Sequence, residues 1–198
     1  MFDPRMLRIF HNGENVHERL SQYFHNSNVT FLEEEEIPRD ILDVHGRCDG
    51  IAMHEGTFVV VEFKSINARK VYKAKEEHEG QIMWYMHMWE THRQKLLDGK
   101  KWDLSPVEKL LLSSKGSVKG EIIMESKQTQ ELFTFPMTLD TELIAKIRKW
   151  FIELQAHVDE KRIPPIIYNE KKFPCQWTGG RCAYWEKCHG DKVSTNML

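Results

Sequence analysis

The sequence predicts an α/β protein in which helices flank a mixed β-sheet. The first observation is a segment at residues 57–65 in which three consecutive valines run into Glu-Phe-Lys. It is the one strongly apolar strand candidate, as expected for a central strand. The second is that apolar residues recur with helical spacing on both sides of it. The third is the order of elements, helix, three strands, helix, strands, helix, which is typical of an α/β arrangement.

The expected elements follow one another along the chain. Gly13 weakens the middle of the first helix and allows a break near Asn12. Glu55-Gly56 marks a turn between two strands, and Pro164-Pro165 stops the last helix, for which Thr138 is a candidate N-cap. The predicted helices cover residues 4–24, 75–97 and 139–161, and the predicted strands cover residues 30–37, 41–53, 57–65, 107–112, 120–125 and 131–135.

Composition limits the class of protein. With 198 residues, 40% hydrophobic and 29% charged, the chain is expected to form one domain over residues 1–198, with a core at about 10–160. A tail at about 171–190 contains cysteines. No apolar run approaches the roughly 20 residues of a membrane span, and no signal-peptide pattern is present, so we expect a cytoplasmic protein with no membrane partner. The net charge of −2 excludes a strongly basic nucleic-acid coating protein but permits a local basic groove.

Two carboxylates and a lysine are predicted to converge. Glu62 and Lys64 alternate with Phe63, so both project from the same face of one strand. Asp49 lies in the neighbouring strand candidate at residues 41–53, and the turn at Glu55-Gly56 brings it alongside. Such a group suits metal-dependent cleavage of phosphodiester bonds. The alternatives are that Asp49 is a turn residue beside Gly50 and that Glu62 and Lys64 form a solvated pair on an edge strand.

Four motifs in order resemble a known family. They are His17, Gly46-Arg47-Cys48-Asp49, Glu62-Phe63-Lys64 and Gln81-Ile82-Met83-Trp84-Tyr85. Over about residues 10–90 the series resembles the RecB-like branch of the PD-(D/E)XK nuclease superfamily. It is similar in particular to the CRISPR-associated adaptation exonucleases and their phage-encoded relatives. The resemblance implies a restriction-endonuclease-like core and a catalytic role for each motif.

The resemblance implies a role for each matched residue. Asp49, Glu62 and the backbone carbonyl of Phe63 would bind Mg²⁺ or Mn²⁺ through oxygen. His17 would be a further ligand, and its imidazole would favour Mn²⁺; the alternative is a surface histidine on an amphipathic helix. Lys64 would orient the attacking water. Gln81 and Tyr85, four residues apart on one helical face, would position Lys64 and contact the nucleic-acid backbone.

Other residues near these motifs admit two interpretations. The basic side chains that follow the central strand either hold DNA phosphates or belong to a solvated loop; they are Arg69, Lys70, Lys73 and Lys75. The large side chains of the second helix are expected to pack in the core and not to stack on bases; they are Trp84, Met86, Met88 and Trp89.

The cysteine tail leaves three alternatives open. Related nucleases hold a [4Fe–4S] cluster with three C-terminal cysteines and one N-terminal cysteine, and Cys175, Cys182 and Cys188 resemble the C-terminal part of that pattern. The gap between the first two is wider than usual, and no cysteine precedes His17. Zinc held by the three cysteines and His189 is the second alternative, and a metal-free packed tail is the third. Cys48, adjacent to Asp49, is expected to face away from the site.

The sequence therefore predicts a metal-dependent DNA exonuclease that acts on single strands or duplex ends, in recombination, repair or CRISPR-type processing in a prokaryotic cell or a phage-infected host. The preference for DNA and for ends comes from the resemblance. Alternatives are a structure-selective or restriction-type endonuclease, a non-catalytic DNA-binding assembly subunit, and an iron–sulfur or zinc structural protein. A homo-oligomer or a recombination or adaptation protein is compatible as a partner. No Walker motif is present in the sequence.

Overall fold

The fold is taken from a computed structural model that describes residues 4–39, 42, 44–67, 69–99, 103–161, 176–177 and 180–181. The chain divides into two compact units, Met1–Arg148 and Lys149–Leu198. The first unit holds the sheet and the candidate site. The described part of the second unit holds the C-terminal part of helix α4 (Thr141–Asp159) and a short hairpin of β6 (Gln176–Trp177) and β7 (Gly180–Arg181).

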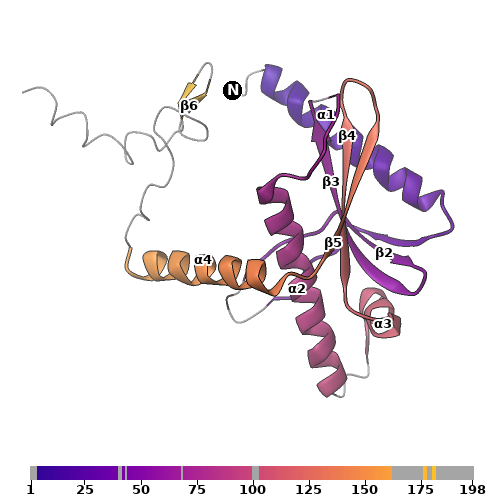
Figure 1. Cartoon of the computed structure of the whole chain (residues 1–198), viewed down its shortest axis with the longest axis vertical. Coiled ribbons are helices and arrows are strands. Elements are labelled where there is room, and N and C mark those ends of the chain that lie inside the picture. The colour runs from indigo at the N-terminus through magenta and orange to yellow at the C-terminus, as the bar shows by residue number, and fades with distance from the viewer. Residues whose placement is uncertain are drawn as a thin grey trace, which may run out of the picture. The chain divides into compact units, whose positions relative to one another are not determined.

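A five-stranded mixed sheet forms the centre of the first unit (Figure 1). Its strands are β1 (Thr30–Glu33), β2 (Gly50–His54), β3 (Thr57–Ile66), β4 (Lys119–Ser126) and β5 (Leu132–Thr138), in that spatial order. Strands β3 and β4 are parallel and all other neighbours are antiparallel. The predicted mixed sheet flanked by helices is confirmed, and β3 is its central strand.

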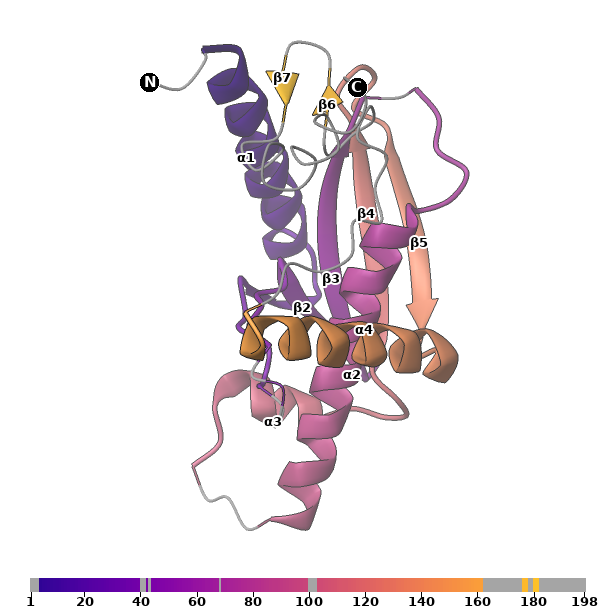
Figure 2. The same ribbon diagram turned by 90° about the vertical axis from the view of Figure 1, so that its left-hand side faces the viewer.

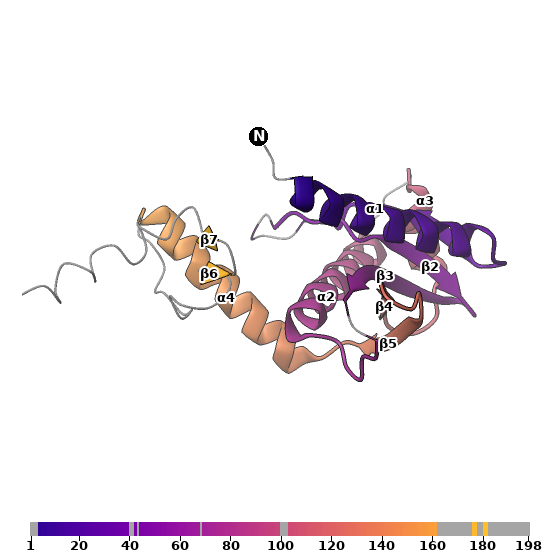
Figure 3. The same ribbon diagram turned by 90° about the horizontal axis from the view of Figure 1, so that it is seen from above.

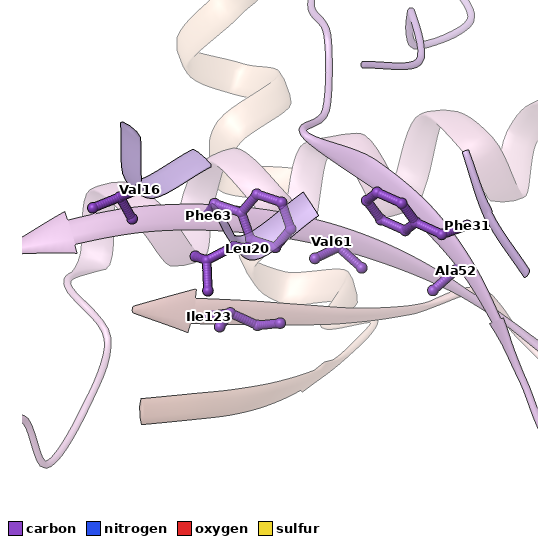
Figure 4. Close-up of a cluster of buried hydrophobic side chains, with 7 residues drawn as sticks. All are labelled: Val16, Leu20, Phe31, Ala52, Val61, Phe63 and Ile123. Carbon is purple, nitrogen blue, oxygen red and sulfur yellow. The ribbon is translucent and has the colours of Figure 1, made fainter. Parts of the chain in front are cut away.

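Helix α1 (Pro4–His25) packs on one face of this sheet and helix α2 (Glu76–Asp98) on the other (Figure 3). Alternation along β3 assigns its side chains to these two faces. Val61 and Phe63 join Val16 and Leu20 of α1 in a buried cluster (Figure 4). Phe58 lies on the other face, with its ring centroid 5.6 Å from that of Trp89 in α2.

The apolar side chains of α2 build the core on that second face. As predicted, Trp84, Met86, Met88 and Trp89 are buried, and Ile82 and Met83 are buried as well. Gly120 of β4 allows the helix to approach closely, because a Cβ there would lie 2.5 Å from Met86 Sδ. Within the described residues, no helix combines the length and apolar character that a membrane span needs.

Several predicted elements differ from the structure. Residues 106–113 form helix α3 (Pro106–Ser113), not a strand, because Ser105 and Glu108 make a reciprocal capping box and Pro106 occupies the first turn. The strand expected at residues 41–53 is reduced to β2, and the one expected at 30–37 to β1, with one isolated bridge between Glu36 and Arg47.

Two details of the helices also differ from the prediction. Helix α1 continues through Gly13 without a break. Helix α4 is capped by Asp140 and not by Thr138, since Asp140 Oδ1 accepts hydrogen bonds from the amides of Glu142 and Leu143 at 2.9 and 3.0 Å. The carboxylate of aspartate satisfies two amides that would otherwise lack partners.

One ion pair fixes α1 on the sheet. Arg19 of α1 donates to both carboxylate oxygens of Glu125 of β4, with a distance of 3.1 Å from Nε to Oε2. The side chain of Glu125 is only 2% exposed, whereas that of Arg19 is 37% exposed. The pKa of Arg19 is raised, first by this hydrogen bond. A buried carboxylate without its cation is costly, so the pair is expected to matter for stability.

Arg19→Met is expected to lower the free energy of unfolding by about 2 kcal/mol at pH 7, because it leaves the Glu125 carboxylate buried without a partner. Urea denaturation measures the loss, with Arg148→Met on an exposed position as the control. Equal losses in the two variants would contradict the role given to this pair.

Candidate active site

Glu62 and Lys64 lie together on the α2 face of β3. Their neighbour Phe63 points to the α1 face, so alternation directs both charged side chains the other way. Lys64 Nζ donates to Glu62 Oε1, and the Glu62 side chain is 2% exposed. The structure thus brings together the pair that the sequence predicted, in the buried centre of the sheet and not at an edge.

Asp49 reaches the same place because β2 and β3 separate there. The pairing of these strands ends at Gly50 and Val61. Beyond that point the amide of Phe63 has no β2 partner and donates to Asp49 Oδ2 at 2.6 Å. In a strand the N–H and C=O of one residue face the same side, so the Phe63 carbonyl also points towards Asp49.

His17 approaches this group from α1. Its Nδ1 lies 3.4 Å from Asp49 Oδ1, and its ring meets the edge of Phe63 with centroids 5.9 Å apart. The pKa of His17 is raised, chiefly by the hydrogen bond with Asp49, although burial acts in the opposite direction. The nearby Arg19–Glu125 pair anchors the same helix and so helps to hold His17 at Asp49.

Glu62 is electrostatically the most perturbed member of the group. Burial, followed by the charge of Asp49, raises the pKa of Glu62 to about 7, and Lys64 opposes the shift. Its Oε2 atom is buried and has no hydrogen-bond partner among the described residues. A divalent cation would satisfy such an oxygen and lower the pKa, so the donor set fits a hard cation. Within the described residues, however, no group of three or more His, Cys, Asp or Glu side chains is placed so that it could hold a metal ion.

Gln81 and Tyr85 lie one turn apart on α2, with a hydrogen bond of 3.0 Å from Gln81 Nε2 to the Tyr85 hydroxyl. Burial is the main cause that raises the pKa of Tyr85, the hydrogen bond with Gln81 opposes it, and the charges of Glu62 and Asp49 add to it. Gly46 permits this arrangement, because a Cβ there would lie 2.9 Å from the Tyr85 ring. Gly46 belongs to the motif that ends in Asp49, but the sequence carries no signal for its contact with Tyr85.

The four basic residues that follow the central strand fall into two pairs with different surroundings. Lys73 and Lys75 line a pocket of about 380 Å³ that Lys64 also lines, whereas Arg69 and Lys70 are exposed outside its lining. His78 of α2 lies in the same pocket and was missed from the sequence. Its pKa is lowered by burial and then by the charge of Lys64. The sequence carries no signal that a histidine near the start of a predicted helix lines the pocket beside Lys64.

Cys48 is the one cysteine that lies among the described residues. Cys48 is buried, its Sγ lies 3.4 Å from the Glu35 carbonyl oxygen, and burial raises its pKa to about 12. A thiol held protonated in this way is a poor metal ligand, in line with the sequence interpretation. Cys175, Cys182, Cys188 and His189 lie outside the described residues, so the cluster, zinc and metal-free alternatives stay predictions.

Comparison with known proteins identifies the family. The model of the PD-(D/E)XK nuclease superfamily matches residues 4–189. The chain belongs to this superfamily. The matched span includes every motif on which the resemblance was stated, and the fold agrees with it. A search of curated protein sequences finds no significant match.

Solved structures give distant similarities. The protein SSO0001 is 19% identical, with a TM-score of 0.46 over 77% of this chain, which spans 62% of SSO0001. The alkaline exonuclease LHK-Exo from Laribacter hongkongensis is 16% identical, with a TM-score of 0.45 over 81% of this chain and 72% of its own. A second LHK-Exo structure, in complex with dAMP, has the same identity and TM-score. The assignment to the superfamily depends on the family model and not on these similarities.

The metal-free protein should reveal the cost of burying Glu62. A carboxyl with a raised pKa in the folded state destabilises the fold as pH rises from its unfolded value near 4.5 to about 7. Glu62→Gln should therefore raise the free energy of unfolding at pH 8, by about 1–3 kcal/mol, and change it little at pH 5.

Urea denaturation in EDTA measures both values. The control is Glu131→Gln, which removes an exposed carboxylate of the same sheet region. A stabilisation by Glu62→Gln that is equal at pH 5 and pH 8 would show that the buried charge is not its cause.

Proposed function

We propose that this protein is a metal-dependent DNA nuclease and that it acts as an exonuclease on single strands or duplex ends. Membership of the nuclease superfamily supports hydrolysis of phosphodiester bonds. The observation that carries the proposal is the convergence of Asp49, Glu62 and Lys64, with one buried carboxylate oxygen that has no hydrogen-bond partner among the described residues. A purely structural ion pair would not need the second carboxylate beside it.

In this proposal Asp49, Glu62 and the carbonyl of Phe63 hold Mg²⁺ or Mn²⁺, and His17 is a further ligand. The cation, when bound, neutralises negative charge that develops on the phosphate. The imidazole of His17 favours Mn²⁺ over Mg²⁺. The protein's own contribution is to fix these donors, through the Phe63 amide on Asp49 and the packing of α1 behind His17.

Lys64 has the second role. Its ammonium group lies beside the carboxylates and also lines the adjoining pocket, so it can contact both the attacking water and the phosphate oxygens. A fixed positive charge in a site with little water stabilises the transition state more than the ground state. Gln81 and Tyr85 position this lysine and contact the backbone of the nucleic acid.

Three alternatives make different predictions. A structure-selective or restriction-type endonuclease uses the same chemistry but cuts within a strand. A non-catalytic DNA-binding subunit would bind without cutting. In a structural iron–sulfur or zinc protein, Asp49 and Glu62 would have no catalytic role, and their proximity would be unexplained. Participation in recombination, repair or CRISPR-type processing, and any oligomer or protein partner, are part of the proposal that the nuclease family suggests.

The test compares end-labelled linear single-stranded DNA with a single-stranded circle, in Mg²⁺, Mn²⁺ or EDTA. We expect metal-dependent loss of the linear strand alone. Lys64→Ala should reduce its rate at least 100-fold, because the charge that stabilises the transition state is lost. Lys95→Ala, an exposed lysine in the last turn of α2, is the matched control and should cleave normally.

The other results select an alternative. Cutting of the circle would establish the endonuclease. Binding without cleavage in any metal would favour the assembly subunit. Equal activity of native protein and Lys64→Ala would remove this lysine from the mechanism.

A further inference from the structure

We propose that Tyr72 and the basic pocket beside Lys64 form a subsite for one nucleotide of single-stranded DNA, in which Tyr72 stacks on the base and the lysines hold the phosphate. The inference rests on the proposed nuclease function and narrows its substrate. It concerns the loop of residues 67 and 69–75, which connects the end of β3 to the start of α2 (Figure 2).

The charge of this loop is opposite to that of the whole chain. The net charge of the protein is −2, yet no Asp or Glu lies between Glu62 and Glu76. The same segment contains five basic residues, namely Lys64, Arg69, Lys70, Lys73 and Lys75. A local run of this kind next to catalytic groups complements the phosphates of a nucleic acid.

The pocket has the chemistry of a nucleotide site. Its volume of about 380 Å³ lies at the small-ligand end of the usual range. Lys64, Lys73 and Lys75 supply positive charge, and Val71 and Met124 supply apolar lining. The Nδ1 atom of His78 is buried and has no hydrogen-bond partner among the described residues. Among the described residues no carboxylate lines the pocket, although Lys75 has a competing partner in exposed Glu77 at 3.5 Å.

Tyr72 lies between two residues that line this pocket, Val71 and Lys73, but is not part of the lining. Its side chain is 88% exposed, more than any other large hydrophobic or aromatic residue among the described ones. The two tryptophans of α2, Trp84 and Trp89, are by contrast buried in the core. The loop that lines the basic pocket therefore also carries one highly exposed aromatic ring.

The loop is held at both ends. At its start, the Ile66 carbonyl accepts a hydrogen bond from the Lys127 amide at 2.9 Å, and Gln128 donates to the Asn67 side chain at 3.1 Å. At its end, Ala74 is buried. Anchored ends limit the entropy that the loop loses when a strand binds.

Stacking on an exposed ring selects single strands. The bases of a duplex are already stacked on their neighbours, whereas an unpaired base has free faces. Stacking of a base on an aromatic side chain contributes about 1–3 kcal/mol and tolerates every base. Tyr72 is thus expected to favour single-stranded DNA without sequence preference, and the lysines to bind either form.

The experiment measures binding in EDTA, where no cleavage interferes. The probe is a single-stranded 20-mer with 2-aminopurine near one end, beside a blunt duplex of the same length. Tyr72→Ala should weaken single-strand binding about 5- to 100-fold, remove the quenching of 2-aminopurine, and change duplex binding less than twofold. Tyr72→Trp should restore both signals. The control is Tyr23→Ala, an exposed tyrosine of α1.

A second variant tests the pocket. Lys73→Gln should weaken both probes and reduce the dependence of log affinity on log salt for the single strand by about 0.7, as expected for one lost phosphate contact. In cleavage assays, Tyr72→Ala should raise KM for single strands and leave kcat unchanged.

Equal losses of single-strand and duplex binding in Tyr72→Ala, no loss, or no rescue by Trp would overturn the subsite. These results are independent of the proposed function. If native protein cleaves DNA but Tyr72→Ala binds normally, only the subsite is wrong. If native protein cleaves nothing, the proposed function fails and the binding comparison still decides the subsite.

Discussion

The hydrogen bond from the Phe63 amide to Asp49 is the interaction on which the candidate site depends. It forms because the pairing of β2 with β3 ends at Gly50, so Asp49, the residue before Gly50 in the chain, is not paired with β3. If the two strands continued side by side, the amide would bond to the β2 backbone and the carboxylate would point elsewhere. Instead, the place where the strands separate brings together the Asp49 carboxylate, the backbone of Phe63, and the side chains of Glu62 and Lys64.

The two faces of the sheet differ around this point: one carries an apolar cluster and the other carries the charged pair. On the α1 face, Val61 and Phe63 form a dry cluster with the helix, and the Arg19–Glu125 pair fixes the helix that carries His17. On the α2 face, the same strand presents Glu62 and Lys64. A single strand thus carries both the hydrophobic cluster and the charged group, and burial of Glu62 raises its pKa.

Much of this arrangement could be predicted from the sequence. The Val59–Val61 run identified the central strand, and alternation placed Glu62 beside Lys64. Residues 107–112 were predicted as a strand but belong to helix α3, because a short segment with Val107 and the three leucines at 110–112 fits a strand as well as a helix, and the capping box at Ser105 was overlooked. The place of His78 and the role of Gly46 against Tyr85 depend on tertiary packing, which local spacing does not encode.

The central claim is that Asp49 and Glu62 share one divalent cation. Calorimetric titration of Mn²⁺ into native protein, Asp49→Asn and Glu62→Gln at pH 8 tests it most directly, with Glu131→Gln as the control. The account predicts one site in the native protein and in the control, and an affinity at least tenfold lower in each of the two site variants. Unchanged affinity in both site variants would show that the cation binds elsewhere and would contradict the account.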